Sequence, residues 1–535
     1  MDLLFSGVTI VTMDEAMHVL FGGYLGVTGT KISYISKDPP SQAPEKIMDA
    51  TGMVLMPGLI NCHTHLAMSL LRGCAEDCCL SRWLSDYVLP REDRLDARAA
   101  RAGVMLSLAE CLQFGVTSVS DLYSFPEVTA QAVAEVGMKA NIAPALTLFA
   151  DESEDFDFEK DPACHRLQEL VEQWHGHDAG RIRIDAGIHA PYTSHYKLWE
   201  PLSAYAKEMG LRMQVHLSET VGEERECQER CGLTSTQLLD CHRVFDVPAA
   251  AAHCNHLSRE DMGLLARQGI SAVHCPVSNL KLVSGVAPVA DMVKAGMNVA
   301  LGTDSAACNN NLDLFEEMKT AALLAKLKAE NPAALPPQAL VMMATVCGAR
   351  AQGREAECGM LKVGMDADLI LVDFTAPHLM PCHDVWSSLV YGVRGSDVAL
   401  TMVRGKILYA GGKFTTIDLD GVVREMRDYA MDRVSLPSRR GPSPAQTAPL
   451  GAASHDAPIP PMLRQMPVES FPFRKRVFLW LPIRNSPFST ALRCWQEPRP
   501  LSRCWALYTK FPWGISSMMP ALATLTQPTT FTPCF

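Results

Sequence analysis

The feature that most constrains the fold of this chain is a repeated alternation between short apolar runs and longer amphipathic stretches. The alternation extends from about Leu59 to Leu340. A chain that alternates strand-like and helix-like segments in this way forms a parallel sheet covered by helices. The eight apolar runs are, in order, GLINCHTHL, GVTSVSDLY, ANIAPALTL, IRIDAGIHAPY, RMQVHLSET, AAAAHCNHL, ISAVHCPVSN and MNVALGTDSA.

Eight strands separated by helices predict an α/β fold of the (β/α)8 TIM-barrel type, with residues 58–355 as the catalytic domain. A doubly wound open sheet is the alternative. The nucleotide-binding version of that sheet is disfavoured, because the sequence contains neither a G-x-G-x-x-G motif nor a P-loop.

The two flanks of the repeat have a different pattern. Early stretches such as GGYLGVTGTKISYIS and late stretches such as ALTMVRGKILYAGGKF alternate apolar runs with glycine-rich turns. This pattern is typical of antiparallel strands. Residues 1–57 and 356–430 are therefore predicted to form one small composite β-sandwich domain, which the barrel interrupts.

The composition changes abruptly after about Met431. Residues 437–535 contain 17 of the 35 prolines and 11 Lys/Arg against 3 Asp/Glu, or +8, which leaves −19 for the rest. One interpretation is a basic, Pro-rich disordered tail. The other is a segment not selected as protein, as after a frameshift or read-through, and the unpatterned aromatic residues favour it. Neither interpretation assigns chemistry to this segment.

The overall charge and the cysteine pattern exclude several classes. A formal net charge of −11 argues against a nucleic-acid partner. No run of 18 apolar residues predicts a membrane span, and the first residues do not resemble a secretory signal, so a cytoplasmic protein is expected. The 18 cysteines include no C-x-x-C pair, which disfavours a thioredoxin-type redox site and a zinc ribbon.

Two histidines one residue apart, His63 and His65, stand at the end of the first apolar run, in PGLINCHTHLAMSLLRG. Alternate side chains of a strand share a face, so both imidazoles would project together while Thr64 points away. Such a pair is suited to binding one metal ion.

Polar side chains also stand at the ends of later runs. Catalytic groups of a (β/α)8 barrel come from the carboxyl ends of several strands, so packing alone does not explain a set at successive strand ends. Three imidazoles and a carboxylate are suited to zinc or ferrous iron, with a position left open for water. Besides the first two histidines, the candidates are His189, His216, Glu219, His253 and Asp304.

The motifs around these residues resemble the amidohydrolase superfamily, specifically its 5-methylthioadenosine/S-adenosylhomocysteine deaminase and chlorohydrolase branch. The resemblance covers nearly all of residues 1–430 and is more specific for the family than for the substrate. It rests on PGLINCHTHLAMSLLRG, WLSDYVLPREDRL, GIHAPYTS, VHLSET, AAHCNHLS, CPVSNLKLVSG and LGTDSAACNNNLDLFEEM.

The resemblance implies one divalent metal ion, zinc or alternatively iron. Glu219 would protonate the ring nitrogen beside the carbon under attack, and His253 would orient the attacking water. Asp304 would accept a proton of that water and pass it to the leaving ammonia. DAGIHAPY contains no lysine, which disfavours the binuclear hydantoinase and dihydroorotase chemistries. The implied metal ligands are His63, His65, His216 and Asp304.

Substrate contacts also follow from the resemblance. Glu92 would bind the ribose hydroxyls, His189 and Glu219 would contact the purine, and Arg181 would pair with the carboxylate of a homocysteine tail. A second arginine of the best-known members is replaced near Pro144. Binding of S-adenosylhomocysteine through its carboxylate would then be weaker, which favours 5'-methylthioadenosine, 5'-deoxyadenosine or adenosine as the substrate.

The resemblance therefore implies a homo-oligomeric enzyme that deaminates an adenosine-type nucleoside to its inosine counterpart. One alternative is the same site acting on guanine, cytosine or a triazine, with ammonia or chloride leaving. The other is a non-catalytic scaffold. Such a scaffold would typically have lost metal ligands, whereas this chain has all four.

Overall fold

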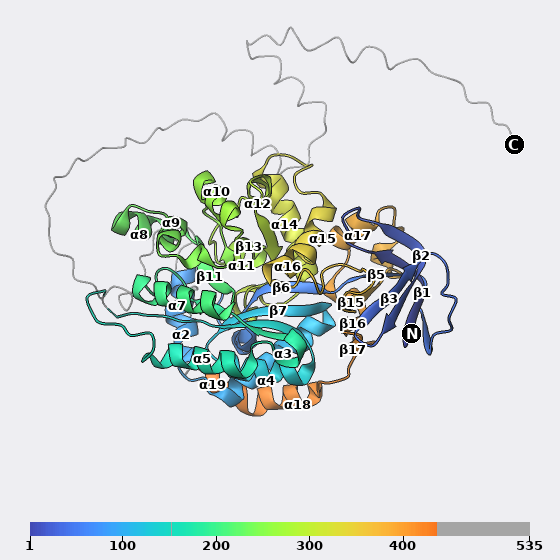
Figure 1. Ribbon diagram of the computed structural model, residues 1–535, viewed down its shortest axis with the longest axis horizontal. Helices are drawn as coiled ribbons and strands as arrows, with labels where there is room; N and C mark the ends of the chain where they lie inside the picture. The colour runs from blue at the N-terminus through green and yellow to red at the C-terminus, as the bar shows by residue number, and fades with distance from the viewer. Residues whose placement is uncertain (151, 436–535) are drawn as a thin grey trace, which may run out of the picture. The chain divides into compact units, whose positions relative to one another are not determined.

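The computed structural model describes residues 1–150 and 152–435. This part of the chain contains a barrel of parallel strands with its helices, and a separate sheet built from both ends of that part (Figure 1). The Pro-rich segment predicted at residues 437–535 lies outside the described residues. Within the described ranges, no helix is both long enough and apolar enough to cross a membrane.

The barrel has eight strand positions that follow one another in chain order, paired in parallel. The fourth position consists of two short strands that break at Asp185, whose amide donates to the carbonyl of Ile142 (2.9 Å). This architecture confirms the predicted (β/α)8 barrel. The strands are β6 (Leu59–Thr64), β7 (Val116–Tyr123), β8 (Lys139–Pro144), β9 (Ile182–Ile184) with β10 (Ala186–Ile188), β11 (Met213–Leu217), β12 (Ala249–His253), β13 (Ser271–His274) and β14 (Asn298–Leu301).

Several of the helices that follow the strands begin at residues whose side chains cap them. Asp96 accepts a hydrogen bond from Ala99 N, and Ser258 forms a capping box with Asp261. The helices are α3 (Ala97–Gln113), α4 (Pro126–Val136), α5 (Pro162–Trp174), α7 (Tyr196–Met209), α8 (Val221–Cys231), α9 (Ser235–Cys241), α10 (Arg259–Gln268), α11 (Pro276–Lys281), α12 (Val289–Lys294), α13 (Ala306–Asn309), α14 (Leu314–Lys328), α15 (Pro337–Met343) and α16 (Val346–Ala351). Between β6 and α3 the chain forms η1 (Leu66–Leu71), α1 (Leu80–Arg82), η2 (Trp83–Val88) and α2 (Leu89–Glu92).

Strand β12 shows how burial overrides local preference. Its sequence AAAAH consists mainly of alanine, the residue with the highest helix propensity. Its residues nevertheless pair in parallel with β11 on one side and β13 on the other, and all five are buried. Tertiary packing therefore determines the conformation of this segment.

The second sheet has nine strands and joins residues from both ends of the described chain. In Figure 1, β1–β3 lie beside β15–β17, to the right of the barrel. Its apolar core is separate from that of the barrel and includes Phe5, Ile10, Leu55 and Leu371. The predicted composite β domain is thus observed. The strands are β1 (Leu3–Val11), β2 (Val19–Thr28), β3 (Lys31–Ser36), β4 (Lys46–Asp49), β5 (Met53–Pro57), β15 (Leu369–Asp373), β16 (Val398–Val403), β17 (Lys406–Ala410) and β18 (Lys413–Phe414).

The C-terminal boundary predicted for this domain, residue 430, needs correction. After β18 the chain returns to the barrel as α18 (Leu419–Glu425), η6 (Met426–Ala430) and α19 (Met431–Val434), which lie beside the barrel helices (Figure 1). The hydroxyl of Tyr429 donates to Asp96 (2.5 Å), and the guanidinium of Arg98 covers the Tyr429 ring (3.9 Å). These contacts attach the segment to α3, so it belongs with the barrel rather than with the β domain.

A buried lysine links the barrel to the β domain. Lys139, the first residue of β8, is 1% exposed, and its Nζ lies 2.6 Å from both Asp366 Oδ2 and Asp368 Oδ2. Burial alone would lower the pKa of Lys139, but the charge of Asp368 raises it above its ordinary value. The ammonium therefore remains charged and compensates two buried carboxylates.

We predict that Lys139→Met lowers the free energy of unfolding by about 3–5 kcal/mol, because removing one partner leaves Asp368 buried without a counter-ion. Denaturant unfolding measures the effect. Lys160→Met is the matched control, since Lys160 forms an exposed ion pair with Asp157. A loss in Lys139→Met no larger than in this control would contradict the prediction.

Candidate metal and catalytic site

The site lies at the carboxyl ends of the barrel strands, and its first two residues come from β6 and the position after it. His63 is 2% exposed, and His65 precedes η1. The two Nε2 atoms lie 3.8 Å and 3.3 Å, respectively, from Oδ1 of Asp304, which follows β14. The two imidazoles therefore face the same carboxylate, which is the common orientation expected from the H-x-H spacing.

Backbone carbonyls fix the orientation of two of the imidazoles. Nδ1 of His65 donates to the carbonyl of Leu122 (2.6 Å), and Nδ1 of His216, in β11, donates to the carbonyl of His189 (2.5 Å). A carbonyl oxygen only accepts hydrogen bonds, so in each neutral ring Nδ1 carries the proton and Nε2 carries a lone pair. The two Nε2 atoms lie 3.3 Å apart.

Two lone pairs at this distance repel each other unless a cation lies between them. Nitrogen ligands about 2.0–2.1 Å from a tetrahedral zinc ion lie about 3.3 Å from one another, so the spacing suits such an ion. Nε2 of His63 is buried and, among the described residues, has no hydrogen-bond partner. The donor atoms of His63, His65 and Asp304 all lie within 4.8 Å of one another. This donor set fits one divalent metal ion.

Asp304 is held by hydrogen bonds to both of its oxygens. Oδ1 accepts from the amide of Ser305 (2.7 Å) and Oδ2 from the hydroxyl of Ser278 (2.7 Å). Burial would raise the pKa of Asp304. Without a bound ion, however, a His65 ring protonated at both nitrogens can donate to it, and this bond and the charges of the imidazoles hold the pKa of Asp304 well below its usual range. Asp304 is therefore a carboxylate, the form that binds a metal ion or accepts a proton.

Glu219 and His253 complete the group. Glu219 follows β11 and His253 ends β12, and their side chains are 6% and 2% exposed. His253 Nε2 lies 3.9 Å from Glu219 Oε2. Burial raises the pKa of Glu219 above its ordinary value, which favours a protonated carboxyl that can donate. Two carboxyl groups of opposite protonation preference, Glu219 and Asp304, thus face one cluster of imidazoles.

Two predicted substrate contacts lie around this cluster. The ring centroid of His189 is 5.0 Å from that of His216, and burial lowers the pKa of His189 to about 4, so its ring is neutral. Glu92, in α2, accepts a hydrogen bond from the hydroxyl of Tyr123 (2.5 Å), whose ring centroid lies 6.1 Å from that of His65. His189 thus lies beside one proposed metal ligand, and Glu92 is joined to the neighbourhood of another through Tyr123, so both remain predicted substrate contacts.

The prediction for Arg181 is wrong. Arg181 immediately precedes β9 and is therefore at the amino end of a barrel strand, opposite to the cluster. Its guanidinium is buried and donates to the carbonyls of Val133 (2.9 Å), Ala134 (3.2 Å) and Met138 (2.5 Å). These bonds close the C-terminal end of α4, so the side chain has a structural role and does not reach a substrate tail.

Sequence reasoning missed three polar residues that contact the cluster. Ser278 donates to Asp304, Asn279 Oδ1 lies 2.8 Å from His253 Nδ1, and Ser284 donates to Glu219 Oε1 (3.0 Å). All three belong to the motif CPVSNLKLVSG, whose position after the seventh strand was the available signal.

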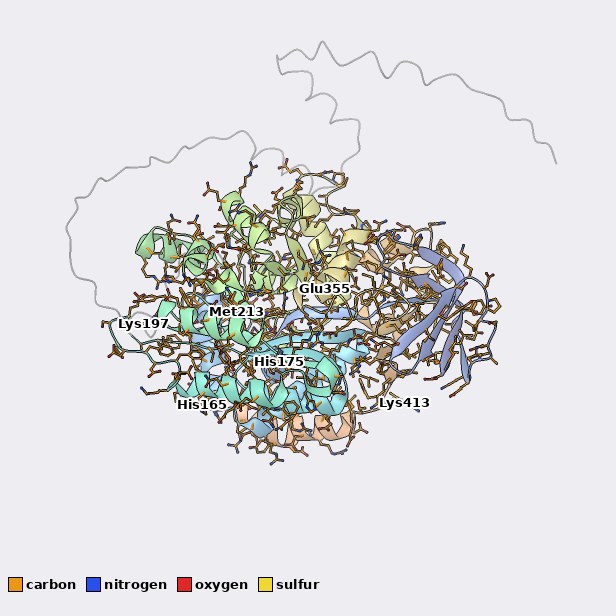
Figure 2. The ribbon with its side chains drawn as sticks, viewed as in Figure 1. His165, His175, Lys197, Met213, Glu355 and Lys413 are labelled. Atoms are coloured by element: carbon orange, nitrogen blue, oxygen red, sulfur yellow. The ribbon has the colours of Figure 1, made fainter. Side chains whose placement is uncertain are left out.

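Histidines away from the strand ends have ordinary local partners. Figure 2 labels His165 and His175, on α5 and directly after it. His165 Nδ1 lies 3.3 Å from Glu169, and His175 Nδ1 lies 3.1 Å from the carbonyl oxygen of Ile184. Their position on and just after an outer helix therefore separates these two histidines from those of the site.

Comparisons with known proteins agree with this geometry. The sequence profile of the amidohydrolase family matches residues 54–408. A 5-methylthioadenosine/S-adenosylhomocysteine deaminase of Moorella thermoacetica is 40% identical over 430 residues, which are 79% of this chain and 98% of the relative. A 5'-deoxyadenosine deaminase of Methanosarcina mazei is 40% identical over 435 residues, 81% of this chain and 99% of the relative.

A solved structure has the same fold. The crystal structure of an adenosine deaminase from Xanthomonas campestris with bound zinc matches with a TM-score of 0.76 and 32% identity, over 81% of this chain and 98% of that chain. Because the similarity extends over nearly the whole length of these relatives and the profile match spans every strand of the barrel, this chain belongs to the amidohydrolase family.

Proposed function

We propose that this chain is a zinc-dependent aminohydrolase that converts an adenosine-type nucleoside to its inosine counterpart and ammonia. The observation that carries the proposal is the convergence of imidazole lone pairs and one carboxylate beside a buried carboxyl group. The names of the relatives, which are deaminases of 5-methylthioadenosine/S-adenosylhomocysteine, of 5'-deoxyadenosine and of adenosine, support the choice of substrate class.

The metal ion would be held by His63, His65, His216 and Asp304. When bound, a zinc ion lowers the pKa of water toward ~7 and so supplies a nucleophile at neutral pH. The protein contributes the orientation of the ligands, through the carbonyls that fix the rings of His65 and His216.

The proton transfers can be assigned to side chains so that every proton a side chain gives or accepts is returned by the end of the reaction. Asp304 accepts one proton of the attacking water, His253 orients that water, and Glu219 donates its proton to the ring nitrogen. The resulting adduct carries a hydroxyl and an amino group on one carbon. Asp304 then protonates the amino group, ammonia leaves, and the hydroxyl proton returns to Glu219 as the carbonyl forms. Each side chain ends in its starting state.

The substrate side chain that this site accepts is proposed to be small and neutral. Glu92 has one oxygen bound to Tyr123, which leaves the other to accept from ribose hydroxyls. Arg181, the cation expected to pair with a homocysteine carboxylate, is occupied by backbone carbonyls at the other end of the barrel. We therefore favour 5'-methylthioadenosine, 5'-deoxyadenosine or adenosine over S-adenosylhomocysteine. A homo-oligomer and a cytoplasmic location are further proposals, taken from sequence resemblance and composition.

The first prediction for this function concerns metal binding. His216→Ala should lower the bound metal to well below one ion per chain and abolish turnover, because it removes a nitrogen that faces His65 at 3.3 Å. Elemental analysis and ammonia release measure the two effects. His165→Ala, on the outer helix α5, is the control and should keep both properties. Full metal content and activity in His216→Ala would contradict the site.

A second prediction separates proton donation from metal binding. Glu219→Gln should keep the metal content of the wild type but lower kcat by about 10²–10⁴-fold, because the amide cannot donate the proton that the ring nitrogen needs. Glu169→Gln, an exposed change on α5, is the matched control. Wild-type turnover in Glu219→Gln would remove its assignment as proton donor.

The experiment that tests the proposed function is an ammonia-release assay on zinc-loaded protein. The panel contains adenosine, 5'-methylthioadenosine, 5'-deoxyadenosine, S-adenosylhomocysteine, guanine and cytosine. We expect release from the nucleosides, with S-adenosylhomocysteine the poorest of them. Activity on the free bases alone would overturn the nucleoside assignment, and equal activity on S-adenosylhomocysteine would overturn the preference for neutral substrates.

A further inference from the structure

One short segment after β13 contacts three residues of the site through three polar side chains. It comprises α11 and the turn that follows it, and its members Ser278, Asn279 and Ser284 are 0%, 1% and 5% exposed. Each side chain has a different partner among the catalytic groups. The segment is therefore built around the site, although none of its side chains is among the proposed metal ligands or proton carriers.

The contact with His253 has a direction that can be derived. Asn255 Nδ2 donates to the backbone carbonyl of Glu219 (2.9 Å), so Asn255 Oδ1 is left as an acceptor. Asn279 Nδ2 donates to that oxygen (2.8 Å), which leaves Asn279 Oδ1 as an acceptor. The remaining partner, His253 Nδ1 at 2.8 Å, must then carry a proton. The backbone carbonyl of Glu219 begins this chain of hydrogen bonds, and it thus determines the tautomer of His253 at the far end.

The consequence for His253 is that its Nε2 carries a lone pair in the neutral ring. This atom faces the cluster, 3.9 Å from Glu219 Oε2. A lone pair there can accept a hydrogen bond from the attacking water, whereas the other tautomer would present N–H. The two amides therefore decide whether His253 accepts or donates toward the site.

The two serines act on the carboxyl groups in a corresponding way. Ser278 occupies Oδ2 of Asp304 and leaves Oδ1 facing His65, and Ser284 occupies Oε1 of Glu219 and leaves Oε2 facing His253. The amide of Ser284 donates to the carbonyl of Asn279 (2.9 Å), which holds the turn against the helix. In each of the three contacts, the segment holds one atom of the catalytic group while the other atom faces the site.

We propose that Asn279, oriented by Asn255, is the positioning residue that holds His253 in the Nδ1–H tautomer and so makes its Nε2 the acceptor for the attacking nucleophile. The effect on turnover rests on the proposed function, but the tautomer does not. Asn279 touches no reacting atom in this scheme, so its effect is transmitted through His253.

The test compares Asn279→Leu, Asn279→Asp and Asn255→Leu. Asn279→Leu removes the acceptor but keeps the branched shape of the side chain, so kcat should fall by about 10–100-fold while KM stays within about threefold. Asn279→Asp keeps an oxygen facing Nδ1 and should recover most of the loss. Asn255→Leu keeps the side chain that contacts His253 but lets the amide of Asn279 rotate by 180°, and it also removes the bond to the carbonyl of Glu219. Its kcat should lie between those of the other two variants.

The matched control is Asn298→Leu. Asn298 donates to Ser271 Oγ (3.0 Å) and to the carbonyl of Cys347 (3.0 Å), at the amino end of β14 and therefore away from the cluster. It loses a partly buried amide but should keep the kcat of the wild type. An equal fall in kcat in Asn279→Leu and Asn298→Leu would mean a general packing effect and would overturn the proposal.

A second readout requires no activity. Two-bond ¹H–¹⁵N correlation on histidine-labelled protein, with the His253 signals identified by their loss in His253→Gln, reports which ring nitrogen carries the proton. We expect Nδ1–H in the wild type and in Asn279→Asp, and a shift toward Nε2–H in Asn279→Leu. Nε2–H in the wild type, or an unchanged tautomer in Asn279→Leu, would overturn the proposal. If the wild type deaminates no nucleoside, the proposed function is refuted. The ¹H–¹⁵N correlation would still decide the tautomer of His253.

Discussion

The site depends on the closure of the barrel between its first and last strands. Asn61, in β6, donates to Thr303 Oγ1 (2.7 Å) and accepts from the Thr303 amide (3.0 Å), and the amide of Asp304 donates to the carbonyl of His63 (3.0 Å). Two proposed metal ligands from opposite ends of the barrel sequence are thus joined by one backbone hydrogen bond. The backbone at Gly302 lies so close to β6 that a Cβ at this position would be 2.8 Å from Cβ of His63. Only glycine therefore fits at residue 302. Bringing the first and last strands of the barrel together costs chain entropy. The buried hydrogen bonds between β6 and the segment after β14, which we call the seam, offset that cost and set the distance between His63 and Asp304.

Strained backbone at the strand ends directs the side chains that do the chemistry. Ser218, His253 and Asp304 have φ values of 50°, 71° and 61°, a region that non-glycine residues seldom adopt. Each such residue costs on the order of 1–3 kcal/mol and persists only where its surroundings hold it. Here the surroundings are the hydrogen bonds of the seam and of the segment that carries Asn279. If these residues had ordinary strand dihedral angles, the side chains would continue to alternate between the two faces of each strand. The side chain at each strand end would then point away from its neighbours in the cluster.

The barrel, the composite sheet and the identity of the cluster could be predicted because each has a local sequence signal. Short apolar runs mark the barrel strands, and the spacing of His63 and His65 alone predicts that their side chains share one face. Arg181 was misjudged because its role was taken from the family resemblance, although the fourth apolar run, IRIDAGIHAPY, begins directly after it and places it at the amino end of that strand. The motif that contains Asn279 follows the seventh strand, but neither it nor the sequence around Asn255 indicates that the two side chains pair. Their importance lies in a hydrogen bond between α11 and the turn after β12, and nothing in the chain near either residue specifies its partner. The return of α18 to the barrel was missed for the same reason, since the contact of Tyr429 with α3 is long-range.

The chemistry of the site follows from giving two identical functional groups opposite protonation preferences a few ångströms apart. Asp304 is surrounded by imidazoles and by hydrogen-bond donors from Ser278 and Ser305, all of which favour the charged carboxylate. Glu219 is buried with a single hydroxyl donor, so desolvation dominates and favours the neutral acid. Pairs of titratable groups driven apart in this way mark the acid and the base of a reaction. Hydrolytic deamination needs both at once, because the ring nitrogen gains a proton as water loses one. His253, held by Asn279, lies beside the acid, and its lone pair would orient the nucleophile between the two carboxyl groups.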